Sequence, residues 1–213
     1  YEPLFDYHYL KRPLELVPLL ARKIPEFEPC TMPALKPGDP DRPMYRLRLE
    51  IWDRVLFHRD VCFDHSHHAN RETRELTAED FEFTFMRIAD PVNNCPCYDG
   101  FIKIDGLEEW TSGIRKIRKE DSNASELPIR ELYGRAGKIR GVRVTGRYDF
   151  ELLLTAKSPI LLYWLSCSIS APLPPEAVDY YDGRNGRPHL KDWPVGTGPY
   201  RMAVHRKDEF IAF

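Results

Sequence analysis

Apolar and polar residues alternate along YRLRLEI, residues 45–51. Because successive side chains of a strand point to opposite faces, this period of two places the apolar side chains of the segment on one side. The apolar positions are Tyr45, Leu47, Leu49 and Ile51, and the polar positions are Arg46, Arg48 and Glu50. The pattern predicts a half-buried β-strand.

A second β-rich region, GVRVTGRYDFELLLT at residues 141–155, has turn-forming residues near its middle. Two runs rich in β-branched, aromatic and aliphatic residues flank the segment from Gly146 to Asp149. This arrangement indicates a β-hairpin. Together with the first strand, it predicts a β-sheet.

The segment LTAEDFEFTFMRIADP, residues 76–91, has the pattern of a capped helix. Thr77 and Asp80 have the spacing of a capping box, so we expect Thr77 to be the N-cap. Pro91 should stop the helix. The apolar residues that recur at helical spacing are Phe81, Phe85 and Ile88.

Three further helices are expected. One covers residues 107–119, and a short one begins near Pro174 or Pro175 and ends by Gly183. In SPILLYWLSCSIS, residues 158–170, Ser158 should cap a helix whose first position is proline. This last helix is apolar on all sides, which predicts that it is buried, with Trp164 in the core.

Strands and helices therefore intermingle, with a longer and less regular stretch over residues 93–138. The fold class that this order predicts is α/β or α+β. The 213 residues suffice for one large or two small units with a proper core.

Charge excludes one class of partner. Charged residues make up 30% of the chain, but the formal net charge is only −2, and no basic cluster indicates nucleic-acid binding. No apolar run approaches the roughly 18 residues of a membrane-spanning helix.

The stretch DVCFDHSHHAN, residues 60–70, is rich in metal-ligand types. Imidazole and thiolate suit zinc or copper, but the stretch has no CxxC or HExxH spacing, and donors so close in sequence seldom converge on one centre. We expect a solvated connecting loop and no cofactor. The alternative is a metal-binding protein or metal-dependent enzyme centred on residues 58–68. Its candidate ligands are Cys62, His65, His67 and His68, with Asp64.

Several segments, in this order, resemble the peptide-type extracytoplasmic solute-binding proteins of ABC transporters, the dipeptide and oligopeptide family called family 5. The similar segments are YEPLFDY and LVPLLARKIPE near the start, YRLRLEIWDRVLFHRDVCF with RELTAEDFEFTFMRIADP, GVRVTGRYDFELLLTAKSPILLYWLS, and WPVGTGPYRM near the end. The last contains the family's PVGTGPY signature, here Pro194 to Tyr200.

The resemblance implies a periplasmic-binding-protein-like type II fold, present in part. The chain would be a fragment of the N-terminal lobe. Residues 1–44 would be a flanking segment that belongs to lobe one, and residues 45–192 would form an accessory α/β subdomain. Residues 193–213 would return into lobe one. The second lobe and a leader peptide would belong to a longer protein.

The implied function is that of a non-catalytic, exported receptor. Such a receptor binds an oligopeptide or comparable solute in a cleft between two lobes and delivers it to an ABC permease in the membrane. A regulatory receptor on the same fold is a further possibility, because fold does not fix function.

The resemblance also implies where a ligand would bind. Gly196 and Gly198 allow backbone conformations closed to other residues, and Pro199 fixes the next φ, so the signature can turn the chain into another sheet near the cleft. A simple Gly-Pro turn without ligand contact is the alternative. The candidate cleft or hinge residues are Tyr1, Glu2, Trp193, Gly196, Thr197, Gly198 and Tyr200.

Five cysteines leave one over after pairing. In an exported protein we expect one or two long-range disulfides among Cys30, Cys62, Cys95 and Cys97, since pairing of Cys95 with Cys97 would be strained. Cys167 should be a buried free thiol.

Overall fold

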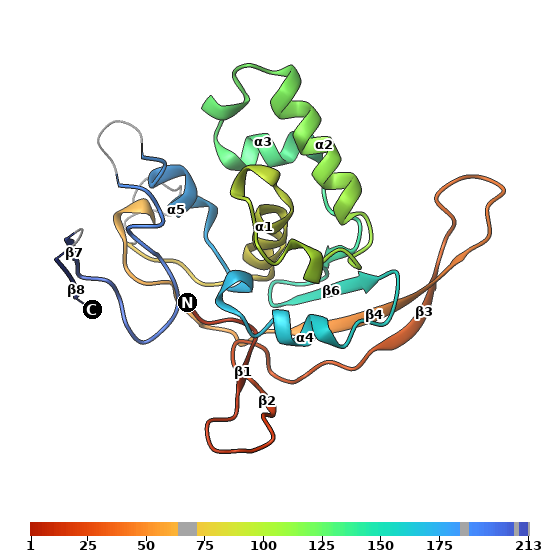
Figure 1. The fold of residues 1–213 in the computed structure, drawn as a ribbon, viewed down its shortest axis with the longest axis horizontal. Helices are drawn as coiled ribbons and strands as arrows, with labels where there is room; N and C mark the ends of the chain where they lie inside the picture. Colours follow the sequence, from red (N-terminus) through yellow and green to blue (C-terminus); the bar gives the residue numbers. More distant parts are fainter. Residues whose placement is uncertain (64–71, 184–187, 207–208, 213) are drawn as a thin grey trace.

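The computed structural model describes residues 1–63, 72–183, 188–206 and 209–212. Its centre is a four-stranded antiparallel sheet in the order β3-β4-β6-β5 (Figure 1). The strands are β3 (Glu28–Met32), β4 (Arg42–Glu50), β5 (Val142–Val144) and β6 (Asp149–Leu154).

The strand predicted from alternation is confirmed as β4. Leu47 lies opposite Leu152 of β6, and Leu49 lies opposite Phe150. All four of these side chains are buried, whereas Arg48 between the two leucines is exposed. The predicted hairpin is confirmed as β5 and β6, and at its turn the backbone N–H of Gly146 donates to the carbonyl of Asp149.

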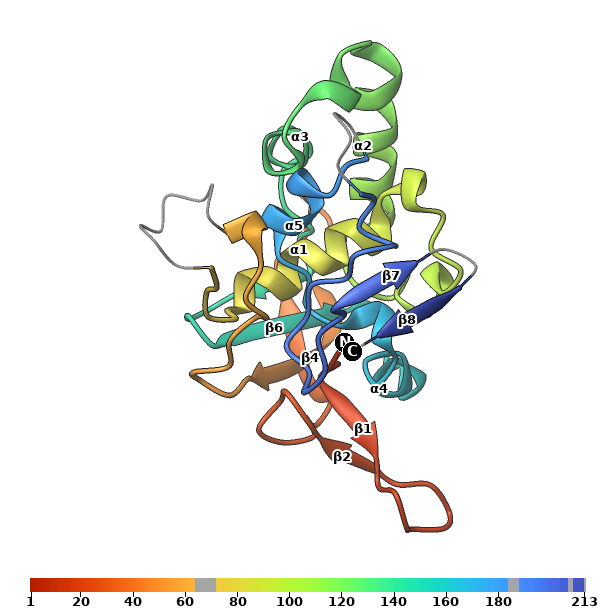
Figure 2. The same cartoon turned by 90° about the vertical axis from the view of Figure 1, so that its left-hand side faces the viewer.

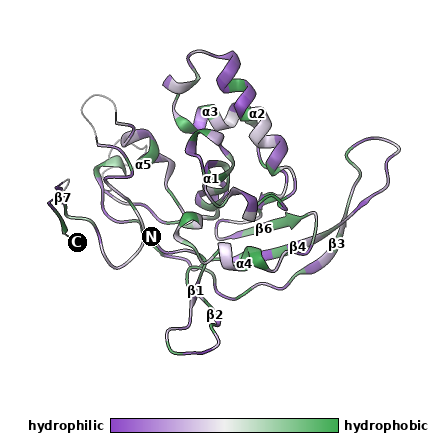
Figure 3. Ribbon diagram, in the orientation of Figure 1, coloured by the Kyte–Doolittle hydropathy of each residue, from purple (hydrophilic) through white to green (hydrophobic). Residues whose placement is uncertain are grey.

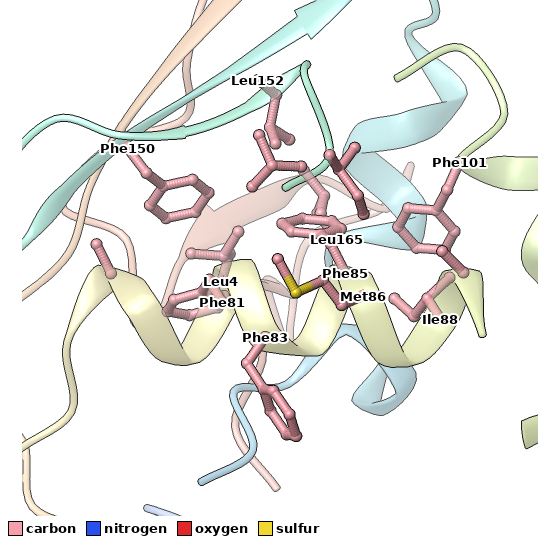
Figure 4. Packing of buried hydrophobic residues seen from close by; sticks show 14 of the residues in the cluster. Leu4, Phe81, Phe83, Phe85, Met86, Ile88, Phe101, Phe150, Leu152 and Leu165 are labelled. Atoms are coloured by element: carbon pink, nitrogen blue, oxygen red, sulfur yellow. The ribbon is translucent and has the colours of Figure 1, made fainter. Parts of the chain in front are cut away.

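Helix α1 (Ala78–Ala89) packs against this sheet. Thr77 is its N-cap in an extended conformation, and the Thr77 N–H donates to Asp80 Oδ2 at 2.9 Å, as the capping-box pattern predicts. Phe81 stacks on Phe150 of β6 with ring centroids 5.2 Å apart. Figure 4 shows Phe83 on the other side of α1, away from Phe81 and Phe85, so the helix is buried on more than one side.

Two helices form an outer layer over α1. They are α2 (Leu107–Glu120), which confirms the helix expected near residues 107–119, and α3 (Ile129–Ala136), which lies in the stretch that the sequence indicates to be irregular. Trp110 of α2 meets Tyr133 of α3 edge to face at 5.2 Å. Figure 3 shows hydrophilic residues along much of α2 and hydrophobic ones along β6, as expected for an outer helix and a central strand.

The helix predicted for residues 158–170 is wrong in length and burial. Helix α4 covers only Ile160–Trp164, Pro159 rather than Ser158 is the N-cap, and a separate 3₁₀ turn follows at Ser168–Ser170. Ile160 is 56% exposed and Tyr163 is 44% exposed, because one side of this short helix packs on the core and the other faces outward. Trp164 is half-buried and lies against Gly100, where an added Cβ would come within 2.4 Å of the indole.

The remaining elements are small. Strand β1 (Phe5–Tyr7) pairs with β2 (Leu16–Pro18), and β7 (Val204–Arg206) pairs with β8 (Phe210–Ala212) near the C-terminus (Figure 2). Helix α5 (Pro175–Tyr180) confirms the predicted short helix. Short 3₁₀ turns cover Val61–Phe63, Pro91–Asn93, Tyr98–Gly100 and Ala124–Glu126.

The predicted disulfides do not form, and all five cysteines are free. Cys30 is on the outermost strand β3 and Cys62 is in the 3₁₀ turn beside α5, whereas Cys95 and Cys97 are in the loop after α1. Cys95 and Cys97 have a single residue between them, and so short a loop strains a bond between them. Cys167 is free as predicted, but it is half-buried rather than buried.

Candidate functional site

The beginning and the end of the chain meet at the glycine-rich signature. The hydroxyl of Thr197 donates to Glu2 Oε2 at 2.8 Å. Gly196 lies against the ring of Tyr1, since an added Cβ would be 3.2 Å from Tyr1 Cδ1, and Gly198 faces the side chain of Glu2. Five of the seven candidate residues therefore come together, although nearly two hundred positions separate them in the sequence.

His58 holds the same turn from a third segment. Its backbone N–H donates to the carbonyl of Gly196 at 2.8 Å, and its Nε2 is 2.6 Å from the carbonyl oxygen of Gly198. A carbonyl only accepts, so the ring must carry its proton on Nε2. The sequence placed His58 only in the candidate metal region, and nothing local to it indicated contact with residues 196–198.

Tyr1 presents its ring to the turn and its hydroxyl to the interior. Half of the residue is exposed, but burial around the hydroxyl raises the pKa of Tyr1 to about 12, and a hydrogen bond with the backbone of Val195 offsets only part of this effect. The phenol is neutral at ordinary pH. It can therefore donate a hydrogen bond as well as accept one.

A pocket of about 200 Å³ adjoins Tyr1. Its walls come from α1, from the loop after α1 and from the segment after α4, and most of the lining is apolar. The guanidinium of Arg87 is its cationic group, and this side chain donates to Asn93 at 3.3 Å. The lining residues are Tyr1, Thr84, Arg87, Ile88, Asn93, Cys95, Pro96, Ser168, Ile169, Ala171 and Leu173.

The two remaining candidate residues, Trp193 and Tyr200, have different surroundings. The indole N–H of Trp193 donates to Asp60 Oδ2 at 3.3 Å, and the hydroxyl of Tyr181 bonds to both oxygens of the same carboxylate. Trp193 thus fixes the segment before the signature to the core. Tyr200 is 75% exposed, and the described part of the chain shows it no hydrogen bond.

The metal reading gains no support from the described residues. They contain no group of three or more His, Cys, Asp or Glu that could hold a metal ion. Burial and the neighbouring carboxylate of Asp60 raise the pKa of the Cys62 thiol, which disfavours the thiolate that a metal needs. His65, His67 and His68 lie outside the described residues.

Comparison with known proteins identifies the protein family whose model matches this chain. Residues 71–213 match the bacterial extracellular solute-binding proteins, family 5 Middle. A relative from Escherichia coli K12, the probable ABC transporter periplasmic-binding protein SapA, is 25% identical over 184 residues, which is 81% of this chain and 29% of that protein. The chain thus spans less than a third of the curated relative.

Solved structures show the same fold. The pheromone receptor PrgZ superimposes with a TM-score of 0.59 at 18% identity, over 96% of this chain and 30% of that one. The periplasmic binding protein DppA from Helicobacter pylori, in complex with the peptide STSA, gives a TM-score of 0.56 at 19% identity, over 99% of this chain and 32% of that one. The predicted periplasmic-binding-protein-like type II fold, present in part, is confirmed.

Proposed function

The chain belongs to the family 5 bacterial extracellular solute-binding proteins of peptide ABC transporters, and from this premise we propose that it is part of a receptor that captures an oligopeptide or a similar solute. The receptor holds the solute between two lobes and passes it to a membrane permease. It changes no covalent bond of the solute. The proteins that it matches are binding proteins, which supports a non-catalytic function.

In this proposal the chain contributes to the first lobe. Residues 1–44 and 193–213 belong to the lobe itself, and residues 45–192 form the accessory subdomain. Strand β3 lies before residue 45 and pairs with β4 over five residue positions, so it fastens the flanking segment to the subdomain. The contacts of Glu2 with Thr197 and of His58 with Gly198 support a single junction where the chain leaves and re-enters the lobe.

The single observation that carries the proposal is the junction of Tyr1 and Glu2 with residues 196–198, beside the pocket at Arg87. A mostly apolar pocket with one cation suits a peptide side chain next to a backbone carbonyl or a carboxylate. The candidate ligand residues remain Tyr1, Glu2, Trp193, Gly196, Thr197, Gly198 and Tyr200. Trp193 supports the junction from the core side, whereas Tyr200 is exposed and free to meet a solute.

We propose that the receptor works outside the cytoplasm, at the surface of the membrane that holds the permease. The matched family consists of extracellular proteins. Among the described residues, no helix is long and apolar enough to cross a bilayer. The permease and the solute are the partners that the proposal requires.

Calorimetry of the full-length protein that contains this chain, titrated with a library of short peptides, tests the proposal. We expect saturable binding of at least one class of peptide, with every peptide recovered unchanged by mass spectrometry. Absence of binding across the library, or steady conversion of a bound peptide, would refute it. The same titration with peptides whose termini are blocked shows whether the junction recognises a terminal charge.

A further inference from the structure

The pocket beside Tyr1 is sized for one side chain of a solute rather than for a whole ligand. Its volume of about 200 Å³ is below the range of about 300–1,000 Å³ that is typical of sites enclosing a small molecule. Most of its lining is apolar, which suits the methylene groups of a side chain. The few polar groups of the lining therefore decide which end group such a side chain can carry.

Arg87 brings a positive charge to this pocket without an ion-pair partner. It is half-buried on α1, and none of the described residues that line the pocket carries a carboxylate. Asp90, three positions further along the chain, is already engaged, because its carboxylate accepts from Arg118 and from the hydroxyl of Tyr133. In the described part of the chain, Arg87 therefore forms no ion pair.

Other arginines of similar burial have their charge satisfied within the protein. Five of them pair with a carboxylate, and one, Arg143, donates to the backbone carbonyl of Arg140. Burial of a charge costs free energy unless a partner compensates for it, so a half-buried guanidinium at the wall of a pocket favours an anion. The five arginines that pair are Arg42, Arg46, Arg74, Arg118 and Arg140.

Asn93 holds the guanidinium of Arg87 in place and leaves most of its donors unused. Arg87 Nη2 donates to Asn93 Oδ1 at 3.3 Å, and Asn93 Nδ2 donates to the carbonyl of Arg87 at 2.8 Å. Nε and Nη1 of Arg87 donate to no described residue, and neither is among the fully buried polar atoms that lack a partner. Both nitrogens therefore keep accessible surface. The planar fork of an arginine matches the two oxygens of a carboxylate.

Thr84 and Tyr1, which also line the pocket, differ in the hydrogen bonds that they can offer. The Thr84 hydroxyl donates to the carbonyl of Asp80 at 2.9 Å and accepts from the backbone N–H of Leu173 at 3.0 Å, so it is already in use. Burial raises the pKa of Tyr1, and the charge of Arg87 lowers it in part, so the two groups are close enough to interact. A carboxylate at Arg87 can therefore accept from the neutral Tyr1 hydroxyl as well.

We propose that this pocket recognises a carboxylate of the bound solute, with Nε and Nη1 of Arg87 as donors and the apolar lining against the aliphatic part of the same group. The inference rests on the proposed function, because it names the chemistry of one subsite in that receptor. A carboxylate at this place supplies the negative charge that the described residues do not. A peptide has two sources of it, an acidic side chain and the free C-terminus.

Calorimetry of the full-length protein with matched peptides tests the inference. A peptide that binds is made in versions with glutamate or glutamine at each position in turn, and with a free or an amidated C-terminus. We expect glutamate at one position to bind about 10- to 100-fold more tightly than glutamine, the range for a hydrogen bond between charged groups. A loss of the same size on amidation, without a difference between glutamate and glutamine, assigns the pocket to the C-terminal carboxylate.

Variants separate Arg87 from its surroundings. Arg87→Met removes the charge and should bring the glutamate and glutamine peptides to within about 3-fold of each other. Asn93→Asp puts a competing carboxylate beside the guanidinium and should lower the preference for glutamate about 10-fold, which tests the pocket even if Arg87→Met does not fold. Arg115→Met is the matched control and should keep the preference, because Arg115 is exposed on α2 and does not line this pocket.

Equal affinity for all versions of the peptide would overturn the inference and leave the proposed function standing, since peptides would still bind. So would a preference for carboxylate that persists in both Arg87→Met and Asn93→Asp, or one that falls equally in Arg115→Met. A protein that binds none of the peptides would instead contradict the proposed function itself, and this inference with it.

Discussion

Glu2 and Thr197 are 195 positions apart in the chain, and the Thr197 hydroxyl donates to the Glu2 carboxylate at 2.8 Å. This bond joins the start of the chain to the glycine-rich signature, and Tyr1 and Gly196 are in contact beside it. The glycine-rich signature therefore acts first as a contact surface for the start of the chain.

Thr197→Val keeps the shape of the side chain and removes the bond to Glu2. We expect unfolding in urea to lose about 1 kcal/mol of stability, the net value of one hydrogen bond, and peptide affinity to fall about 5-fold. Thr145→Val is the matched control, because Thr145 is an exposed residue in a hairpin turn and only its backbone N–H is bonded in the described structure. Equal losses in both variants would show that the bond to Glu2 contributes nothing specific.

Gly196→Ala places a methyl group 3.2 Å from the ring of Tyr1. The ring must move, so we expect about 1–2 kcal/mol of destabilisation and weaker peptide binding, measured by urea unfolding and calorimetry. Gly113→Ala should have the opposite effect. Gly113 is in helix α2 with nothing within 4 Å of the added atom, and alanine stabilises a helix interior by about 0.5–1 kcal/mol.

Asp105 should give the chain part of its sensitivity to acid. Burial raises the pKa of Asp105, but hydrogen bonds from Arg140 and Arg42 outweigh this effect, and the pKa is lowered overall. A carboxyl group with a lower pKa in the folded state stabilises the fold above its unfolded pKa of about 3.9, and this contribution is lost as the pH falls through the folded value.

Asp105→Asn should therefore cost about 2–4 kcal/mol at pH 7, since two arginines lose a buried partner. The difference from the unchanged protein should shrink below about pH 4, as urea midpoints measured between pH 7 and pH 3 would show. Asp39→Asn, at an exposed position, should make no difference at either pH. A pH-independent cost of Asp105→Asn would contradict this assignment.

Cys62 should resist alkylation while the protein is folded. The residue is 3% exposed, and burial and Asp60 raise the pKa of its thiol, so little thiolate is present at pH 8. Cys30 and Cys97 are half-buried, and we expect them to react first with iodoacetamide. Mass spectrometry of the digested protein distinguishes the sites. Labelling of Cys62 at the rate of Cys30, with the fold intact, would contradict the buried environment.

The sequence predicted those elements whose capping, stop or alternation pattern lies within a single short segment. Helix α1 has its stop at Pro91 and its capping pair at Thr77 and Asp80 within one segment, and β4 has its alternation within seven residues. Helix α4 shows the limit of such reasoning. An apolar run indicates that its side chains avoid water, but it does not say how much neighbouring surface exists to cover them, and here one side is left exposed.

Only some features of the candidate site could likewise be predicted from the sequence. Glycine, threonine and proline in the signature marked a turn, and the resemblance placed that turn near a ligand. Neither indicated that His58 would hold the carbonyl of Gly198 or that Trp193 would bond to Asp60. These contacts join residues from different elements, and the spacing along the chain carries no signal for them.

The sequence by itself determined the mixed helix and sheet class and the approximate limits of α1, α2, β4 and the β5–β6 hairpin, because capping, alternation and turn residues act over a few neighbouring positions. The family of solute-binding proteins was indicated by the resemblance of several segments taken in order. Only the tertiary structure decided which thiols stay apart, which face of α4 is covered, and which residues meet Tyr1 and Glu2. Those outcomes depend on packing between segments far apart in the chain, where the available surface rather than the local pattern selects the partner.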